Sequence, residues 1–245
     1  MYRGDNRRLL AEYPDGYFDL VLDDPPYGIG EGAASRKNHN RPVKQKNGKV
    51  VCLKGAEWKA KDWDRQRPDR AYFAELRRVS KAQVIWGGNY FADLLPPSPG
   101  WVVWDKINGS NDFSDFEMAY TSIPGGARLF RYMWNGMMQG KSLAEPHIPR
   151  GNKKTNEQRI HPTQKPELLY LWLLDRFAKP GMRILDPHMG SGSSAVAVLS
   201  AGMNLEYVGI EKDAEYYSLA TARVGVAYCD KLISMRQYSL PFADE

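Results

Sequence analysis

The sequence contains little cysteine and no long apolar run. Only two cysteines occur in 245 residues, Cys52 and Cys229, far apart and in no spacing typical of metal ligands. We therefore expect reduced thiols in a cytoplasmic protein and no disulfide framework. The longest apolar stretch, Leu168 to Leu174, is too short to span a bilayer, and residues 1–8 lack the apolar core of a signal peptide. We expect no membrane association.

A metal-binding site is also not expected. The four histidines are scattered along the chain, at His39, His147, His161 and His188. Asp23 and Asp24 form an acidic pair, but no histidine or further carboxylate follows at ligand spacing. Metal-dependent chemistry is therefore not predicted from this sequence.

The residues that are abundant indicate a globular protein with a polyanionic partner. Hydrophobic residues make up 42% of the chain, which is enough for a substantial core. The formal net charge of +5 favours a polyanion such as nucleic acid, although many basic proteins bind none. We expect one domain over residues 1–245.

Hydrophobic periodicity predicts alternating strands and helices. In the first half, strands are expected at 17–22, 83–86 and 101–104. A helix is expected over 69–79, where apolar residues recur at three- and four-residue steps, namely Tyr72, Phe73, Leu76 and Val79. A β-hairpin is expected from 116–121 and 128–134, around the turn Ile123-Pro124-Gly125-Gly126. Between these elements, residues 28–68 form a long polar segment, rich in lysine, arginine, asparagine and glycine.

The second half shows the clearest α/β alternation. Helices are expected at 166–174, 193–200 and 214–224, and strands at 182–185 and 206–210. The segment before them, up to residue 159, ends in a basic tract rich in proline and glycine. The alternation is typical of a sheet that is mostly parallel.

The segment Val21–Gly30, VLDDPPYGIG, ends a buried strand with two carboxylates, two prolines and a tyrosine. Neither proline can donate a backbone hydrogen bond, so the strand cannot continue. A rigid turn with solvated aspartates would explain the prolines. It would not explain a carboxylate and an aromatic ring at the carboxyl end of a strand, where open α/β sheets bind ligands. Asp24 and Tyr27 are therefore candidate functional residues.

A second strand end, at 184–194, carries a glycine-rich turn, ILDPHMGSGSS. Glycines there let the backbone approach a ligand, and the following helix N-terminus favours electron-rich atoms. Glu211 ends the next strand about 20 residues later, the spacing of an acidic residue that binds ribose hydroxyls. A tight turn with a solvated glutamate is the alternative, and NAD-binding folds share the pattern.

Four segments in this order resemble the β class of DNA amino-methyltransferases. They are VLDDPPYGIG, IHPTQKPELL, ILDPHMGSGSS and VGIEKD, and the resemblance runs from Gly4-Asp5 to beyond Glu211. It implies an α/β, Rossmann-like methyltransferase fold that uses S-adenosylmethionine, with a mostly parallel central sheet, an antiparallel hairpin and a circularly permuted motif order. It also implies three regions: a mobile basic loop at 28–68, target recognition at 105–160 and a cofactor-binding half at 161–230.

The resemblance implies that Asp24, Pro25, Pro26 and Tyr27 are the catalytic segment. The Asp24 carboxylate and the Pro25 carbonyl would accept hydrogen bonds from the target amine, and Tyr27 would stack on the flipped base. Asp23, in contrast, is expected to be solvated at the strand end or to orient the loop. His188 departs from the family, which usually carries phenylalanine there.

The remaining site residues are also carried over from the family. Asp5 is expected to bind the adenine amine of S-adenosylmethionine and Glu211 its ribose. The residues expected around the rest of the cofactor are Asp24, Thr163, Lys165, Asp186, His188, Gly190, Ser191 and Gly192. His161 is as well explained by packing in a turn. The residues expected to contact DNA are Lys44, Lys46, Lys49, Asn135 and Gln139, the lysines through phosphates and the amides through base edges. A solvated loop and simple hairpin packing are the alternatives.

The favoured function is methylation of adenine N6 in double-stranded DNA by a site-specific enzyme of a prokaryotic or phage-infected cell. Cytosine-N4 methylation shares the scaffold, although family members acting on cytosine usually carry serine in place of Asp24. RNA or protein methylation and a non-catalytic DNA-binding module are the more distant alternatives. A homodimer and a cognate restriction endonuclease are open as partners. The recognition sequence cannot be read from the chain.

Overall fold

The computed structural model describes residues 1–31, 41–44, 50–53, 59–107, 114–135, 138–140, 149–150 and 156–239. These residues form two compact units. One consists of Met1–Pro25 with Asp69–Glu245, and the other of Pro26–Pro68. The division falls inside the Asp-Pro-Pro-Tyr segment, between Pro25 and Pro26.

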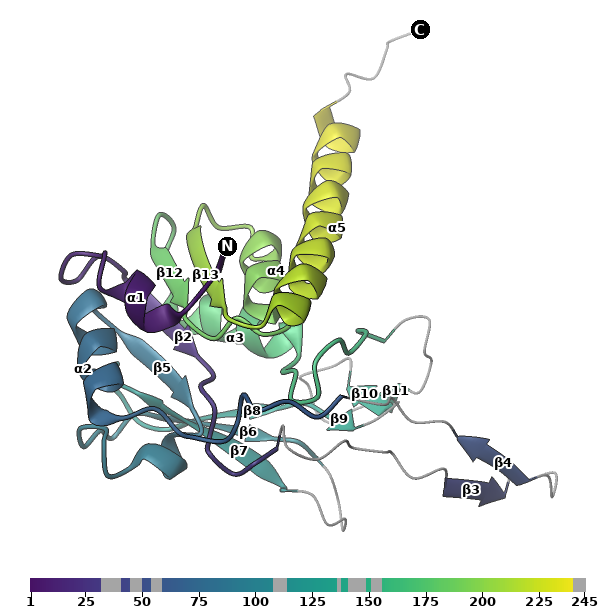
Figure 1. Ribbon diagram of the computed structural model, residues 1–245. Coiled ribbons are helices and arrows are strands. Elements are labelled where there is room, and N and C mark those ends of the chain that lie inside the picture. The colour runs from purple at the N-terminus through teal and green to yellow at the C-terminus, as the bar shows by residue number, and fades with distance from the viewer. Residues whose placement is uncertain are drawn as a thin grey trace, which may run out of the picture. The chain divides into compact units, whose positions relative to one another are not determined.

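The larger unit is built on an eight-stranded sheet in the order β1-β13-β12-β2-β5-β7-β6-β8 (Figure 1). Its strands are β1 (Tyr2–Arg3), β2 (Leu20–Asp23), β5 (Gln83–Trp86), β6 (Trp101–Asp105), β7 (Phe116–Thr121), β8 (Arg128–Arg131), β12 (Arg183–Asp186) and β13 (Glu206–Glu211). Within this sheet only β7 runs antiparallel to its neighbours. The predicted mostly parallel α/β fold is confirmed.

The hairpin was predicted with the wrong strand pairing. β7 does not pair with β8; it pairs antiparallel with β5 and with β6, and β8 pairs parallel with β6 on the far side. The chain after β7 therefore passes β6 before it forms the edge strand. The second arm also breaks early, because β8 ends at Arg131 and β9 (Trp134–Asn135) joins a separate three-stranded sheet with β10 (Met138–Gly140) and β11 (Pro149–Arg150).

The helices of the larger unit are α1 (Asn6–Leu10), α2 (Arg70–Val79), α3 (Glu167–Phe177), α4 (Ser193–Ser200) and α5 (Ala214–Ser239), with a short 3₁₀ helix, η1 (Gly88–Phe91). Asp69 caps α2 by accepting a hydrogen bond from the Tyr72 backbone N–H at 2.9 Å. The predicted buried positions of α2 are confirmed. The final helix continues well past the predicted end at residue 224. None of the helices in the described ranges has the length and apolar character needed to cross a membrane.

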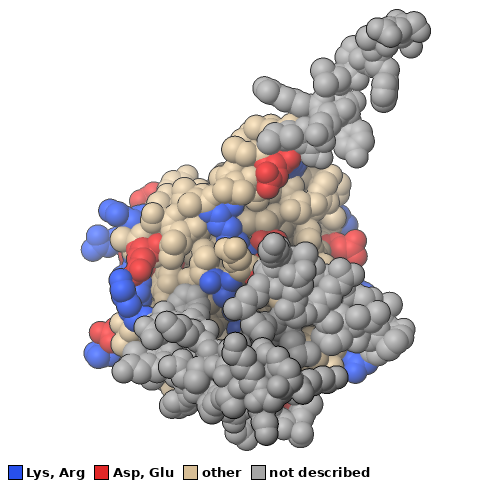
Figure 2. Space-filling view, turned by 90° about the vertical axis from the view of Figure 1, so that its right-hand side faces the viewer, with Lys and Arg blue, Asp and Glu red and all other residues tan. Residues whose placement is uncertain are grey.

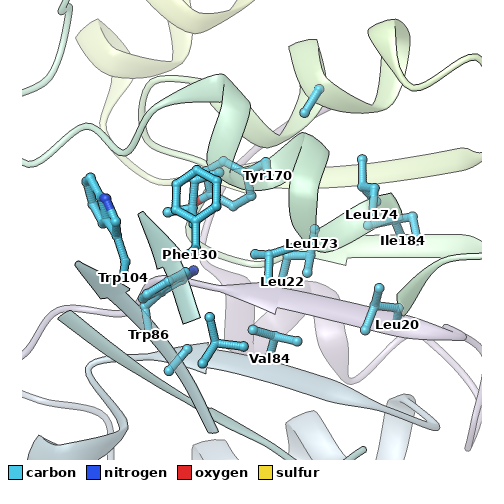
Figure 3. Packing of buried hydrophobic residues seen from close by; sticks show 14 of the residues in the cluster. Leu20, Leu22, Val84, Trp86, Trp104, Phe130, Tyr170, Leu173, Leu174 and Ile184 are labelled. Atoms are coloured by element: carbon cyan, nitrogen blue, oxygen red, sulfur yellow. The ribbon is translucent and has the colours of Figure 1, made fainter. Parts of the chain in front are cut away.

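Alternate residues of the central strands face opposite layers of helices. Leu20 and Leu22 of β2 pack with Leu173 and Leu174 of α3, as Figure 3 shows, together with Ile184 of β12. The next residues along β2 point to the other face, where the Asp23 side chain reaches Tyr72 of α2. The core therefore fixes both faces of β2 and holds its carboxyl end between the two layers.

The smaller unit, Pro26–Pro68, contains the antiparallel pair β3 (Arg41–Lys44) and β4 (Val50–Leu53). The buried Asp64 side chain accepts hydrogen bonds from the backbone N–H groups of Gly28 and Glu31, both at 2.8 Å. Gly28 has a φ of +74° and Gly30 a φ of +77°, which explains the glycines on both sides of Ile29. The residues after the Asp-Pro-Pro-Tyr segment therefore form a defined turn.

Candidate functional site

Four neighbouring parallel strands of the sheet end in acidic residues. In sheet order, β1 leads to Asp5, β13 ends at Glu211, β12 ends at Asp186, and β2 ends at Asp23 and continues to Asp24. The carboxyl ends of parallel strands lie at one edge of a sheet, so these residues line a single edge. This acidic edge, defined as these five residues, gathers carboxylates that are far apart in sequence.

Glu211 is held in place by the glycine-rich turn. Its Oε2 accepts a hydrogen bond from the Gly190 N–H at 2.9 Å, and its Oε1 accepts one from the Asp213 N–H at 2.7 Å. Burial raises the pKa of Glu211, and these two backbone donors partly oppose the rise. The carboxylate is thus oriented before any ligand arrives, which favours its predicted role at the ribose.

The two glycines of the turn are needed for different reasons. Gly190 has a φ of +53°, and a side chain there would meet only the His188 carbonyl, 3.8 Å from its Cβ. Gly192 also has a positive φ, of +73°, but a Cβ there would lie 3.2 and 3.3 Å from side-chain atoms of Val224 and Ala220 on α5. Gly190 therefore shapes an open turn, whereas Gly192 allows α4 to begin close against α5.

Asp186 lies beneath this turn and is 1% exposed. It accepts hydrogen bonds from the Ser194 hydroxyl at 2.5 Å and from the His188 backbone N–H at 3.1 Å. Burial is the main cause that raises its pKa to about 7, and nearby Asp23 adds to the rise. Ser194, at the start of α4, is a site residue that the sequence analysis missed.

Asp23 was expected to be solvated at the strand end or to orient the loop. The expectation that it is solvated is wrong, because Asp23 is 0% exposed. Its Oδ1 lies 2.7 Å from Nδ1 of His188, and its Oδ2 accepts a hydrogen bond from the Tyr72 hydroxyl at 2.8 Å. A buried carboxylate needs such partners to offset the loss of hydration. Asp23 therefore ties the strand end to α2 and to the glycine-rich turn, and its role is structural.

His188 is the third member of this cluster. Its Nε2 lies 2.8 Å from the Asn6 side-chain nitrogen, which also donates to the Pro187 carbonyl at 3.1 Å. With that amide nitrogen as donor, Nε2 is an acceptor and Nδ1 carries the proton given to Asp23. Burial disfavours a charged ring, but the attraction of Asp23 outweighs it and raises the pKa of His188. Taking up a proton would require the Asn6 amide to turn.

Asp24, the predicted catalytic carboxylate, is in an ion pair. Lys165 Nζ lies 2.5 Å from Asp24 Oδ1 and 3.2 Å from Glu117 Oε2, and the lysine side chain is 4% exposed. Lys106 contacts the other oxygen of Glu117 at 2.5 Å. Glu117 and Lys106 come from β7 and the end of β6, and no local motif marked them in the sequence.

The remaining predicted cofactor residues occupy two places. Asp5 caps α1, where its Oδ1 accepts from the Arg7 N–H at 3.0 Å and its Oδ2 lies 3.4 Å from Lys212 Nζ. Thr163 contacts His161, whose ring packs edge-on against Tyr216 at 4.2 Å between centroids. The contact with Tyr216 fits the packing explanation of His161.

Among the residues predicted to contact DNA, only the side chain of Gln139 is described by the structure. Gln139 is 3% exposed. Its side-chain nitrogen donates a hydrogen bond to the Glu157 carbonyl at 2.8 Å, and its side-chain oxygen accepts one from the Glu157 N–H at 2.9 Å. This arrangement contradicts a role for Gln139 in reading bases. Lys46 and Lys49 lie outside the described residues, as do the side chains of Lys44 and Asn135. On the described part of the face in Figure 2, basic and acidic side chains are interspersed.

The donors and charges of S-adenosylmethionine fit the acidic edge. That molecule carries ribose hydroxyls, an exocyclic amine, an ammonium group and a sulfonium, which are hydrogen-bond donors or cations, and one carboxylate, which a helix N-terminus can accommodate. The edge offers oriented carboxylates, an open glycine turn and the N-terminus of α4. A doubly wound sheet with this edge is the arrangement of a Rossmann-like methyltransferase.

Comparisons with known proteins agree with this class. A model of the DNA methylase family (N6/N4) matches residues 82–222. YubD of Escherichia coli is 25% identical over 236 residues, covering 91% of this chain and 88% of that protein. The Type II methyltransferase M.HinfI of Haemophilus influenzae is 25% identical over 257 residues, covering 91% of this chain and 67% of that protein.

Solved structures share the fold. The M1.HpyAVI–SAM complex matches with a TM-score of 0.52 at 18% identity, covering 91% of this chain and 97% of that one. The cytosine-N4-specific PvuII DNA methyltransferase matches with a TM-score of 0.51 at 14% identity, covering 95% and 92%. The chain belongs to the N6/N4 DNA methylase family. The family inferred from the sequence motifs is confirmed.

Proposed function

We propose that this protein methylates the exocyclic N6 amine of adenine at specific sites in double-stranded DNA. The observation that carries the proposal is the position of Asp24. It follows β2 directly, and β2 neighbours β12, whose glycine-rich turn adjoins Glu211 at the end of β13. A carboxylate thus stands beside the edge that fits the methyl donor, where a target amine has to arrive.

An adenine amine is a poor nucleophile because its lone pair is delocalised into the ring. Two acceptors that bond its hydrogens favour tetrahedral nitrogen, which localises the lone pair. The Asp24 carboxylate is one such acceptor, and the backbone carbonyl of Pro25, fixed by the double proline, is the second. The carboxylate also stabilises positive charge as it develops on the nitrogen.

S-adenosylmethionine, when bound, supplies an electrophilic methyl group on a sulfonium. The residues of the acidic edge are proposed to bind this cofactor. Glu211 would accept from the ribose hydroxyls and Asp5 from the adenine amine, while Gly190 leaves room for close approach of the backbone. Asp186 and His188 would support the turn from below, through the hydrogen bond that links them.

The target base is hidden in a duplex, so it must leave the helix and enter a pocket. Tyr27, which follows the double proline, is proposed to stack on the flipped base. The basic segment 28–68 is proposed to contact phosphates through lysines such as Lys44, Lys46 and Lys49. These residues belong to the smaller unit or lie outside the described residues, and the proposal for them rests on sequence.

Cytosine-N4 methylation is the main alternative. The fold does not discriminate between the two bases, because the PvuII enzyme, named as cytosine-N4-specific, shares it. What favours adenine is the carboxylate of Asp24, since relatives that act on cytosine usually carry serine at that place. A carboxylate is the stronger acceptor for the two hydrogens of an amine.

The direct test is to express the protein in methylation-deficient bacteria and sequence their DNA by a method that detects modified bases. We expect N6-methyladenine in one sequence context. N4-methylcytosine would establish the alternative, and unmodified DNA from cells that contain folded protein would contradict both.

The role of Asp24 is tested separately with purified protein. Asp24→Ala should abolish methyl transfer from labelled donor while calorimetry still detects cofactor binding. Asp175→Ala, an exposed position on α3, is the control and should behave as wild type. Turnover of Asp24→Ala within about tenfold of wild type, roughly 1.4 kcal/mol of barrier, would contradict a catalytic role.

A further inference from the structure

A chain of alternating charges leads from the catalytic carboxylate into the protein. Asp24 Oδ1 contacts Lys165 Nζ at 2.5 Å, Lys165 Nζ lies 3.2 Å from Glu117 Oε2, and Glu117 Oε1 contacts Lys106 Nζ at 2.5 Å. The four residues come from four separate places in the chain: the end of β2, the segment before α3, β7, and the end of β6. The sheet therefore brings them together.

Lys165, in the middle of this chain of charges, is shielded from water, whereas the Glu117 side chain is 25% exposed. Lys165 is 4% exposed, and its ammonium also lies 5.4 Å from the ring centroid of Trp86, an arrangement that favours a cation. Glu117 Oε2 is inaccessible to solvent and has no hydrogen bond of good geometry, although Lys165 faces it at 3.2 Å. Lys165 thus has two carboxylates within reach and is firmly bonded to one of them.

The charges along the chain support one another. Burial alone would lower the pKa of Lys165, but Asp24 and Glu117 outweigh burial and raise it. Burial alone would raise the pKa of Glu117, but Lys165 and Lys106 lower it to about 2. The other titratable groups near Asp24 are Asp23, which pairs with His188, and the buried hydroxyl of Tyr170 on α3. Lys165 is therefore charged at every physiological pH.

We propose that Lys165 is a positioning residue for Asp24, held in place by Glu117 and Lys106, and that this chain aims the Asp24 carboxylate at the target amine. The proposal rests on the proposed catalytic role of Asp24. Without Lys165, the carboxylate would lose the contact that fixes its orientation. Small misplacements of a catalytic group are costly, on the order of 100-fold in rate for about 1 Å.

This assignment differs from the role that the sequence predicted for Lys165, a contact with the methionine end of the cofactor. At that end the cofactor carries an ammonium group and a sulfonium, which a lysine ammonium would repel, and a carboxylate, which it would attract. Both ionic partners of Lys165 in the structure are carboxylates. The two assignments make opposite predictions for cofactor affinity.

The test measures single-turnover methyl transfer at saturating cofactor, with cofactor affinity from calorimetry. Lys165→Met should lower the rate about 100-fold and leave the affinity unchanged. Lys165→Arg should recover part of the rate, because it keeps the charge. Lys179→Met, at an exposed site before β12, is the control and should match wild type. A wild-type rate for Lys165→Met at saturating cofactor, with weakened affinity, would overturn the proposal in favour of a cofactor contact.

Glu117→Gln provides a second test that does not depend on the folding of Lys165→Met, because glutamine keeps the shape of glutamate. It should lower the single-turnover rate less than Lys165→Met does, with unchanged thermal unfolding and cofactor affinity. The exposed Glu206→Gln on β13 is its control. If the residues act as one chain, the double variant should be no slower than Lys165→Met alone.

Two results would overturn the proposal that these residues act as one chain. One is a wild-type rate for Glu117→Gln. The other is a double variant whose loss of rate is the product of the losses in the two single variants. These results are distinct from failure of the proposed function. If the proposed function fails, Asp24→Ala itself would remain active, whereas failure of the Lys165–Glu117 proposal alone would leave Asp24→Ala inactive.

Discussion

The individual carboxylates at the acidic edge differ in their availability to a ligand, because each has different neighbours. Asp23 is buried and saturated by Tyr72 and His188, Asp24 is bound to a lysine, and Glu211 is oriented by two backbone donors. The sequence marks all three only as acidic residues at strand ends. Which of them are available to a ligand is decided by neighbours from distant parts of the chain.

Glu211→Ala is expected to weaken cofactor binding. Hydrogen bonds to a charged acceptor contribute about 1.5–3 kcal/mol each, so loss of even one should raise the dissociation constant at least about tenfold. Calorimetry with S-adenosylmethionine measures this directly. Glu206→Ala, at the opposite end of the same strand, is the matched control. An unchanged dissociation constant for Glu211→Ala would mean that this carboxylate only braces the turn.

Asp186 should make the stability of the free protein depend on pH. Its pKa in the folded state is about 7, against an ordinary value of 3.8, so between these values the folded state holds a proton that the unfolded state has lost. Its contribution to the free energy of unfolding therefore falls as pH rises from about 4 to about 7. Asp186→Asn cannot titrate and should lack this fall.

Urea unfolding of both proteins at several pH values tests this expectation. The difference in free energy of unfolding, wild type minus Asp186→Asn, should decrease steadily across that window. Other groups that titrate there, such as Glu157, cancel in the difference. A difference that stays constant with pH would show that Asp186 titrates alike in the folded and unfolded states.

At the scale of elements, local patterns predicted strands and helices well but not their partners. The strand at 83–86 and the helix at 193–200 were predicted with the observed bounds. The hairpin was wrong because a turn such as Ile123–Gly126 suggests pairing of its flanking strands, whereas β6 lies between them and pairs with β7 on one edge and with β8 on the other. Pairing between distant strands leaves no local signal. For the same reason Glu117 and Lys106 could not be found from motifs.

Arg223 links helix α5 to α3, to Glu157 and to the glycine-rich turn. Arg223 contacts Glu157 at 2.6 Å and Glu167 at 2.5 Å, and it donates to the Ser191 carbonyl at 2.9 Å. Its side chain is 15% exposed, and burial together with Glu167 raises the pKa of Glu157 to about 7. Removing the arginine would leave two carboxylates facing each other with little hydration.

Arg223→Met should therefore reduce the free energy of unfolding by about 3 kcal/mol, the order expected when one partner of a buried ion pair is removed. Chemical denaturation measures the change. Lys212→Met is the control, since its side chain is 81% exposed and surface pairs contribute little. A loss no larger than that of the control would place Arg223 among the ordinary surface ion pairs.

At the scale of the whole molecule, the order of motifs along the chain predicted the family and the permuted arrangement. Strand β2, which carries the proposed catalytic segment, precedes β12 and β13 in sequence, yet β2 and β12 are neighbours in the sheet. The basic segment 28–68 was recognised as distinct, and Pro26–Pro68 is a compact unit by itself. The next prediction depends on the positive charge of this segment and not on its fold.

Replacing Lys44, Lys46 and Lys49 by glutamine should flatten the salt dependence of DNA binding and leave the methylated site unchanged. Each phosphate contact adds about 0.9 to the slope of log affinity against log salt, and phosphate contacts carry no base information. Binding is measured on duplex DNA at several salt concentrations. Lys81→Gln with Lys179→Gln is the control, because these lysines precede β5 and β12, at the amino edge of the sheet.

The control should keep the wild-type slope. A changed target site with an unchanged slope would mean that the three lysines read bases. An unchanged slope and site would show that this segment does not touch the duplex.

The pairing of β1 with β13 has a consequence for synthesis of the protein. Gly4 donates a hydrogen bond to the Glu211 carbonyl at 3.0 Å, and the neighbouring residues Asp5 and Lys212 are 207 positions apart. Contacts of such long range form late in folding. A nascent chain on the ribosome exposes Asp24 early but has no partner for its first strand until β13 emerges. The edge proposed to hold the methyl donor is therefore complete only after β13 has been synthesised, and we expect products that end before β13 not to bind the donor.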